Sequence, residues 1–330
     1  NYILYLLVQT VGVFINNVTI SWIAKKEYPF ISDKDVQPLS KEEKKGLFVN
    51  IKALTINKLS ALLVNNTDNI VITFLDGLVS VGLASNYTLL ANTLKSLVTQ
   101  LFNGLTASIG NLNAIEKEDK KYQFFKMFNL ANFWIFGWGA IGIALVSGDI
   151  IQLCFGKEYV LGLSIPCILA VNFYMVGMQN AVYAYKNTMG LFRYGQYLLV
   201  ITAAINLILD FALGIKWGMF GIYLATAIAR LFTNTWYEPY AVFKYGLQKP
   251  FRLYIKKYVE YLVVLLFAGG LCYFLCDLCR FHIVVNAFFK CIICSIVPNI
   301  IFFCCYYRTE EGKYLISMII KVCKKVLCRK

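Results

Sequence analysis

Residues 258–278 read YVEYLVVLLFAGGLCYFLCDL, an apolar run in which Glu260 and Asp277, near its two ends, are the charged residues. As a helix rising 1.5 Å per residue, this run extends ~31 Å, which matches the ~30 Å hydrocarbon core of a bilayer. The sequence here predicts a transmembrane helix.

Similar runs occur along the whole chain of 330 residues, of which 59% are apolar and 15% charged. Soluble domains carry about 25% charged residues. We therefore expect an all-α polytopic membrane protein with about nine transmembrane helices. The expected spans are residues 2–23, 51–75, 79–109, 124–146, 163–185, 197–214, 218–240, 258–278 and 282–305.

Basic residues are distributed unevenly over the connections between these spans. Alternate connections and the tail hold 25 of the 32 Lys and Arg residues, whereas the other connections hold Lys157, Lys216 and Arg280. Cytoplasmic loops of membrane proteins are enriched in Lys and Arg, so we expect the C-terminus in the cytoplasm. The net charge of +14 then indicates anionic lipid rather than nucleic acid as the partner. The tail at 313–330 has the pattern of an amphipathic helix on the membrane surface.

Four basic residues fall inside the spans: Lys58, Lys95, Arg230 and Lys290. A basic side chain facing lipid at a helix centre costs about 2.5–3.5 kcal/mol. Lys95 and Arg230 lie near mid-depth and are expected to face a polar lumen, with structural ion pairs as the alternative. Lys58 lies about 10 Å from a span end and could extend to the surface. We expect Lys290 either to have a structural role or to extend to the membrane surface as Lys58 could.

Polar residues recur every three or four positions along the third span, which places them on one face of a helix. They are Ser85, Thr88, Asn92, Lys95, Thr99, Asn103 and Thr106. Similar stripes on the second and fifth spans predict a shared polar cavity. We expect Asn92, Asn103, Lys58, Lys95 and Arg230 to line it as a cationic substrate-binding lumen.

A second set combines carboxylates with neutral oxygen ligands. Asp68, Asn206, Asp210 and Thr226 are expected to share a depth of roughly 6–12 Å below the non-cytoplasmic surface. Such oxygens suit Na⁺, and a carboxylate can carry H⁺. The alternative is that these acids form ion pairs with Lys or Arg.

Features of enzymes and metal sites are missing from the sequence. His282 is the single histidine, and Cys276-x-x-Cys279 by itself is a weak signal for a metal site. Neither a phosphate loop nor a dinucleotide fingerprint occurs. We expect no catalytic residue, no cofactor and no metal, and we interpret the late cysteines as small buried hydrophobes.

Several short motifs, in this order and spacing, resemble those of bacterial polysaccharide repeat-unit flippases. This family lies within the multidrug/oligosaccharidyl-lipid/polysaccharide exporter superfamily. The motifs are KKEYP at 25–29, TDN at 67–69, VGLASNY at 81–87, ASIGN at 107–111, FGKEY at 155–159, MGLFR at 189–193, INL at 205–207 and WYEP at 236–239.

The resemblance implies a MATE-like bundle of fourteen spans in two six-helix lobes plus two additional helices. Since the chain begins at Asn1 inside an apolar run, we expect it to lack the N-terminal part. Residues 1–50 would hold the last helix of the N-terminal lobe and a cytoplasmic loop, and 51–240 the C-terminal lobe. Residues 241–305 would hold the two additional helices, and 306–330 a basic cytoplasmic tail.

The implied function is to flip undecaprenyl-diphosphate-linked oligosaccharide across the bacterial cytoplasmic membrane by alternating access. The product would serve surface polysaccharide synthesis (O-antigen, capsule or exopolysaccharide), together with a polymerase and glycosyltransferases. Some relatives hold a cation on a carboxylate, an Asn-x-x-x-Asp pair and a Thr, which Asp68, Asn206, Asp210 and Thr226 resemble. Two alternatives are a cation-coupled multidrug exporter of the same superfamily and a membrane polymerase or glycosyltransferase. The polymerase would need a longer extracytoplasmic loop.

Overall fold

The structure, a computed structural model, describes residues 2–32, 38–195, 197–279 and 282–327. The chain divides into two compact units, residues 1–49 and residues 50–330. The first unit holds α1 (Tyr2–Glu27), a short 3-10 helix (Pro29–Ser32) and the start of α2 (Lys41–Asp76). The second unit holds the rest of α2 and the candidate site.

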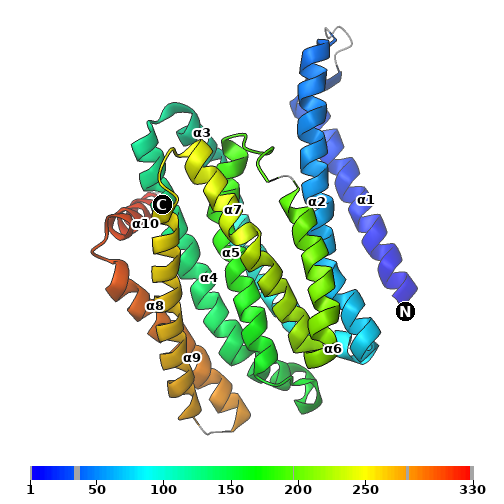
Figure 1. Cartoon of the computed structure of the whole chain (residues 1–330), viewed down its shortest axis with the longest axis vertical. Coiled ribbons are helices and arrows are strands. Elements are labelled where there is room, and N and C mark those ends of the chain that lie inside the picture. The colour runs from blue at the N-terminus through cyan, green and yellow to red at the C-terminus, as the bar shows by residue number, and fades with distance from the viewer. Residues whose placement is uncertain (1, 33–37, 196, 280–281, 328–330) are drawn as a thin grey trace. The chain divides into compact units, whose positions relative to one another are not determined.

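Long helices make up the second unit, and the described residues contain no strand. They are α3 (Leu78–Ile115), α4 (Glu118–Phe155), α5 (Ser164–Thr188), α6 (Leu198–Phe232), α7 (Asn234–Ala241), α8 (Arg252–Asp277), α9 (Ile283–Tyr306) and α10 (Glu310–Leu327), shown in Figure 1. The predicted all-α class is confirmed. At one end of this bundle α4 and α8 begin, α3 and α5 end and α10 packs. We call it the α10 end, and the other the opposite end.

Helix α4 is the centre of the bundle, and it packs against α3, α5, α8, α9 and α10. Large aromatic side chains fill this core. The rings of Phe133 on α4 and Tyr261 on α8 stack with centroids 4.4 Å apart, and Phe302 on α9 lies 4.8 Å from Phe133. Of the late cysteines, Cys272, Cys276 and Cys294 are buried in the same core, as expected for small hydrophobes, whereas Cys291, Cys304 and Cys305 are exposed.

Helix α6 is a hairpin of two arms rather than one straight helix. The chain reverses at Gly218, whose φ of 54° and ψ of −141° are not helical. A side chain at Gly221 would overlap the carbonyl of Leu213, so the absence of a Cβ lets the two arms approach closely. The turn lies at the break expected between the spans 197–214 and 218–240.

Six segments of the described residues are long and apolar enough to cross a membrane: α1, α4, α5, the α6–α7 segment, α8 and α9. Helices α2 and α3 are 36 and 38 residues long, but their polar residues keep them out of this set. The chain is a multi-pass helical membrane protein. The expected total of nine spans stays a prediction.

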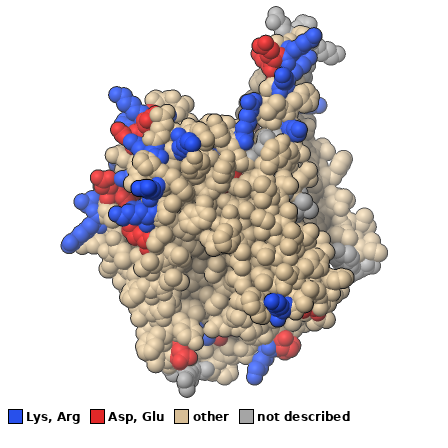
Figure 2. Space-filling model, in the orientation of Figure 1, with Lys and Arg blue, Asp and Glu red and all other residues tan. Residues whose placement is uncertain are grey.

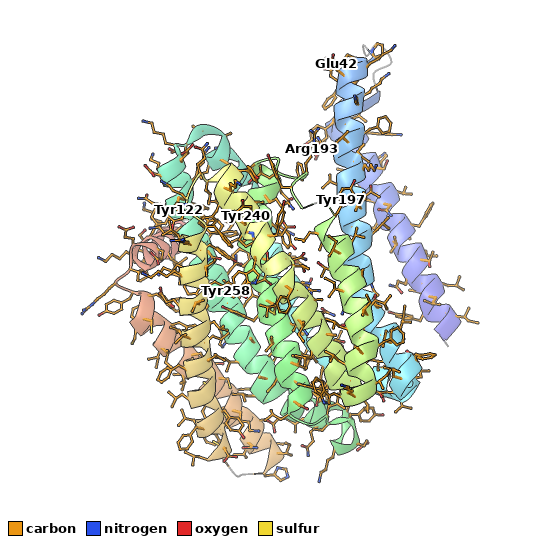
Figure 3. All side chains as sticks on the ribbon, viewed as in Figure 1. Glu42, Tyr122, Arg193, Tyr197, Tyr240 and Tyr258 are labelled. Atoms are coloured by element: carbon orange, nitrogen blue, oxygen red, sulfur yellow. The ribbon has the colours of Figure 1, made fainter. Side chains whose placement is uncertain are left out.

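Charged side chains of the second unit gather near the ends of its helices. Figure 2 shows blue and red residues near the α10 end and the opposite end, with a tan surface between them. Tyr122 and Tyr240 lie at the α10 end in Figure 3. This distribution is typical of a bundle whose middle contacts hydrocarbon.

Candidate functional site

A cavity of about 370 Å³ lies among α2, α3, α5 and α6, inside the second unit. Its lining is largely polar although it lies within an apolar bundle. The polar lining residues are Asn66, Asp68, Asn69, Thr88, Asn92, Lys95, Asn172, Tyr223, Thr226 and Arg230. The predicted polar cavity is therefore present in the structure.

Two basic side chains reach this cavity from different helices. Lys95 comes from α3 and Arg230 from the second arm of α6, and both are partly buried. Asp68 from α2 is the acidic residue among the lining residues. Two cations and one carboxylate around a confined polar space would attract an anionic group more strongly than a neutral one.

The residues predicted to hold a cation form a hydrogen-bonded cluster beside the cavity. Asn206 Nδ2 donates to Asp210 Oδ1 at 2.8 Å and to Thr226 Oγ1 at 3.1 Å. The Thr226 hydroxyl donates to the Asp68 carboxylate, at 3.1 Å from Oδ1 and 3.0 Å from Oδ2. The cluster thus joins α2 to both arms of α6. All four side chains are buried, Asn206 and Asp210 completely.

Oxygen atoms in this cluster retain capacity to bind a ligand. Asn206 Oδ1 and Asp210 Oδ2 are buried and accept no hydrogen bond within the described structure. Two buried carboxylates linked through one amide and one hydroxyl repel each other when both are ionised. A small hard cation, or a proton on one carboxylate, would remove that repulsion and use the remaining oxygens.

The structure brings together some of the predicted lumen residues and separates others. Asn92, Lys95 and Arg230 line the cavity. Lys58 on α2 and Asn103 on α3 are exposed and are not among its lining residues. Lys290 binds Asp149 of α4 at 2.7 Å, which is the structural role expected for it.

Sequence reasoning missed part of the polar interior. Asn66 and Tyr223 line the cavity without having been expected there, and Tyr223 accepts at its carbonyl a hydrogen bond of 2.8 Å from Nδ2 of Asn172, which the polar stripe of the fifth span did include. Lys186, expected among the loop cations, is instead buried and binds the buried Glu238 of α7 at 2.6 Å. In the sequence, this ion pair is indicated only by Glu238, the acidic residue within the WYEP motif at 236–239.

No protein-family model matches the chain, and a search of curated protein sequences gives no significant match. Among solved structures, the fold is similar to that of a lipid II flippase, MurJ, in its inward closed conformation, with a TM-score of 0.50. The alignment covers 78% of this chain and 52% of that one at 16% identity. At this identity the similarity shows the fold, and the chain spans about half the length of that flippase.

Proposed function

We propose that the protein flips a lipid-linked oligosaccharide across a membrane, with the cavity between α2, α3, α5 and α6 binding its diphosphate. The observation that carries this proposal is the placement of Lys95 and Arg230 on one polar cavity inside an apolar bundle. An Arg fork and a Lys ammonium are the usual protein ligands of phosphate oxygens. The fold that this chain shares with a lipid II flippase supports the same class of substrate.

In this proposal the substrate is undecaprenyl-diphosphate-linked oligosaccharide, moved by alternating access for surface polysaccharide synthesis. Glycosyltransferases that build the repeat unit and a polymerase that consumes it would be the functional partners. The membrane would be the bacterial cytoplasmic membrane, and the distribution of Lys and Arg supports an orientation with the α10 end in the cytoplasm.

Ion coupling is the second element of the proposal. Asp68, Asn206, Asp210 and Thr226 would bind Na⁺ or H⁺, and Asp68 and Thr226 also line the cavity. Occupancy of the cluster would change the charge next to Lys95 and Arg230. An ion gradient would then alter the affinity for an anionic substrate through direct electrostatics.

A flipping assay on the protein in vesicles tests the role of the cavity. The readout is the rate at which a fluorescent undecaprenyl-diphosphate oligosaccharide crosses the bilayer. Lys95→Gln and Arg230→Gln each remove a charged hydrogen-bond donor, so we expect the rate to fall roughly tenfold or more at low substrate concentration. Lys58→Gln is the matched control and should flip normally. Normal flipping by both cavity variants would exclude this function for the cavity.

The multidrug exporter remains the second candidate because Phe173 and Tyr223 give the cavity an aromatic part. Aromatic faces and Asp68 would suit an organic cation. Lys95 and Arg230 would repel such a substrate. Export of a lipophilic cation that improves in Lys95→Gln would favour this function, whereas loss of oligosaccharide flipping in the same variant would favour the flippase.

A further inference from the structure

An apolar groove of about 750 Å³ runs along α8, on the side of α5 away from the cationic cavity. Helices α4, α5, the second arm of α6 and α8 form its walls, and it shares no lining residue with that cavity. Along α8 it extends from Tyr258, labelled in Figure 3, to Tyr273. These residues lie ~22 Å apart along a helix, which exceeds one leaflet's share of the ~30 Å hydrocarbon core.

A groove of this size in contact with hydrocarbon must be filled. Its lining is almost entirely aliphatic and aromatic, so water gains no hydrogen bonds there. An empty groove would leave its walls without dispersion contacts on one side. Inside a bilayer the chemistry that fits is a flexible hydrocarbon chain.

The groove leads into a small polar pocket at the opposite end of the bundle. This pocket, of about 330 Å³, shares Leu145 and Tyr273 with the groove. Asp277, Asn286 and Lys290 are among the residues that line it. The apolar groove thus ends in a polar pocket at the ends of the helices. This arrangement fits an amphiphile that has one chain in the groove and its headgroup at the surface.

The polar groups of the pocket favour a zwitterionic headgroup. The charge of Lys290 is balanced by Asp149 at 2.7 Å, although an ammonium has two further donors for a phosphate oxygen. Asp277 at the end of α8 is an acceptor, and Asn286 Oδ1 is a buried oxygen that accepts no hydrogen bond within the described structure. The carboxylate of Asp277 would repel a purely anionic headgroup, whereas a primary ammonium could donate hydrogen bonds to both Asp277 and Asn286.

We propose that the groove and the pocket together bind one phosphatidylethanolamine molecule. One acyl chain lies between α5 and α8. The phosphate contacts Lys290, and the ammonium contacts Asp277 and Asn286. Such a lipid would fix α8 against the bundle formed by α4, α5 and α6, independently of what the cationic cavity transports.

Native mass spectrometry of the protein, released from bilayers of equal phosphatidylethanolamine and phosphatidylglycerol, tests this site. We expect one retained phosphatidylethanolamine per protein. Gly270 lines the groove, and a Cβ there meets open space, so Gly270→Leu should project its side chain into the groove and displace the lipid. Gly142→Leu is the matched control, because its Cβ also meets open space and it does not line the groove.

The headgroup preference is tested separately with Asp277→Asn, at an exposed position that should fold normally. Loss of a charged acceptor should reduce the preference for phosphatidylethanolamine by roughly tenfold. The proposal would be overturned by equal lipid retention in Gly270→Leu and Gly142→Leu, by no headgroup preference in the unsubstituted protein, or by retention of an isoprenoid lipid instead. Absence of any retained lipid would also overturn it.

Discussion

Within the described structure, the Thr226 hydroxyl and the Asn206 amide together connect the two buried carboxylates of the candidate cation site. The hydroxyl donates to Asp68 and accepts from Asn206, which in turn donates to Asp210. Thr226→Val keeps the shape but removes the hydroxyl, and a buried polar group left without its partner costs about 1–3 kcal/mol. We expect the protein to gain thermal stability with Na⁺, and we expect Thr226→Val to lose that gain.

Thr226→Ser is the matched variant for this experiment, since it retains the hydroxyl and should retain the Na⁺-dependent rise in Tm. Choline chloride at equal ionic strength controls for screening. If Na⁺ raises the Tm of Thr226→Val as much as that of the unsubstituted protein, the hydroxyl is no part of a sodium site. If Na⁺ stabilises neither, the cluster carries protons or is purely structural.

Local spacing predicted those residues of the site that lie on one helix. Asn206 and Asp210 are four residues apart and therefore share a face, and Lys95 belongs to a stripe of the same period. Spacing says nothing about how far along a helix a cavity extends. The cavity contacts the α3 stripe from Thr88 to Lys95, so Asn103 lies beyond it. The Lys186–Glu238 pair joins residues 52 positions apart, and no helical period links them.

Among the elements, α10 is amphipathic as expected, and the structure packs it against α4. Lys126 binds Glu310 and Lys257 binds Glu311, each at 2.9 Å. The hydrogen bond from Lys126 lowers the pKa of the Glu310 carboxyl below its ordinary value. That ion pair therefore contributes to docking above the ordinary pKa of a glutamate, about 4.3, and the contribution is lost as the pH falls through the lowered value.

Gly312 makes this docking geometry attainable, because a Cβ there would overlap the backbone carbonyl of Tyr306 at the end of α9. Gly312→Ala forces the two helices apart, and overpacking of this kind costs about 1–3 kcal/mol. We expect amide hydrogen exchange in α10 to increase roughly tenfold while exchange in α4 stays unchanged. Gly142→Ala, in open space, should leave both unchanged. Unaltered exchange of α10 in Gly312→Ala would show that this contact does not hold the helix.

At the scale of the whole chain, the apolar runs predicted the positions of the helices better than their ends, and α2, for example, begins ten residues before the span expected at 51–75. The run 282–305 corresponds to α9 (Ile283–Tyr306), and the break expected before Gly218 corresponds to the turn of the α6 hairpin. The helices also extend past the expected spans, as α4 does at both ends, because hydropathy marks the hydrocarbon-facing part and a helix continues beyond it. Packing partners were not predictable, since α8 and α9 are apolar on all sides and their sequence does not select α4.

The orientation of the bundle is the last prediction, and it depends on charge alone. Lys and Arg resist translocation, so the end that carries most of them should stay in the cytoplasm. Green fluorescent protein fused after Lys330 should therefore fluoresce, and alkaline phosphatase fused there should be inactive. Alkaline phosphatase inserted in the connection at 157–163, at the opposite end, should be active. The reverse pattern at both positions would show that the bundle has the opposite orientation, and it would reverse the direction of the proposed transport.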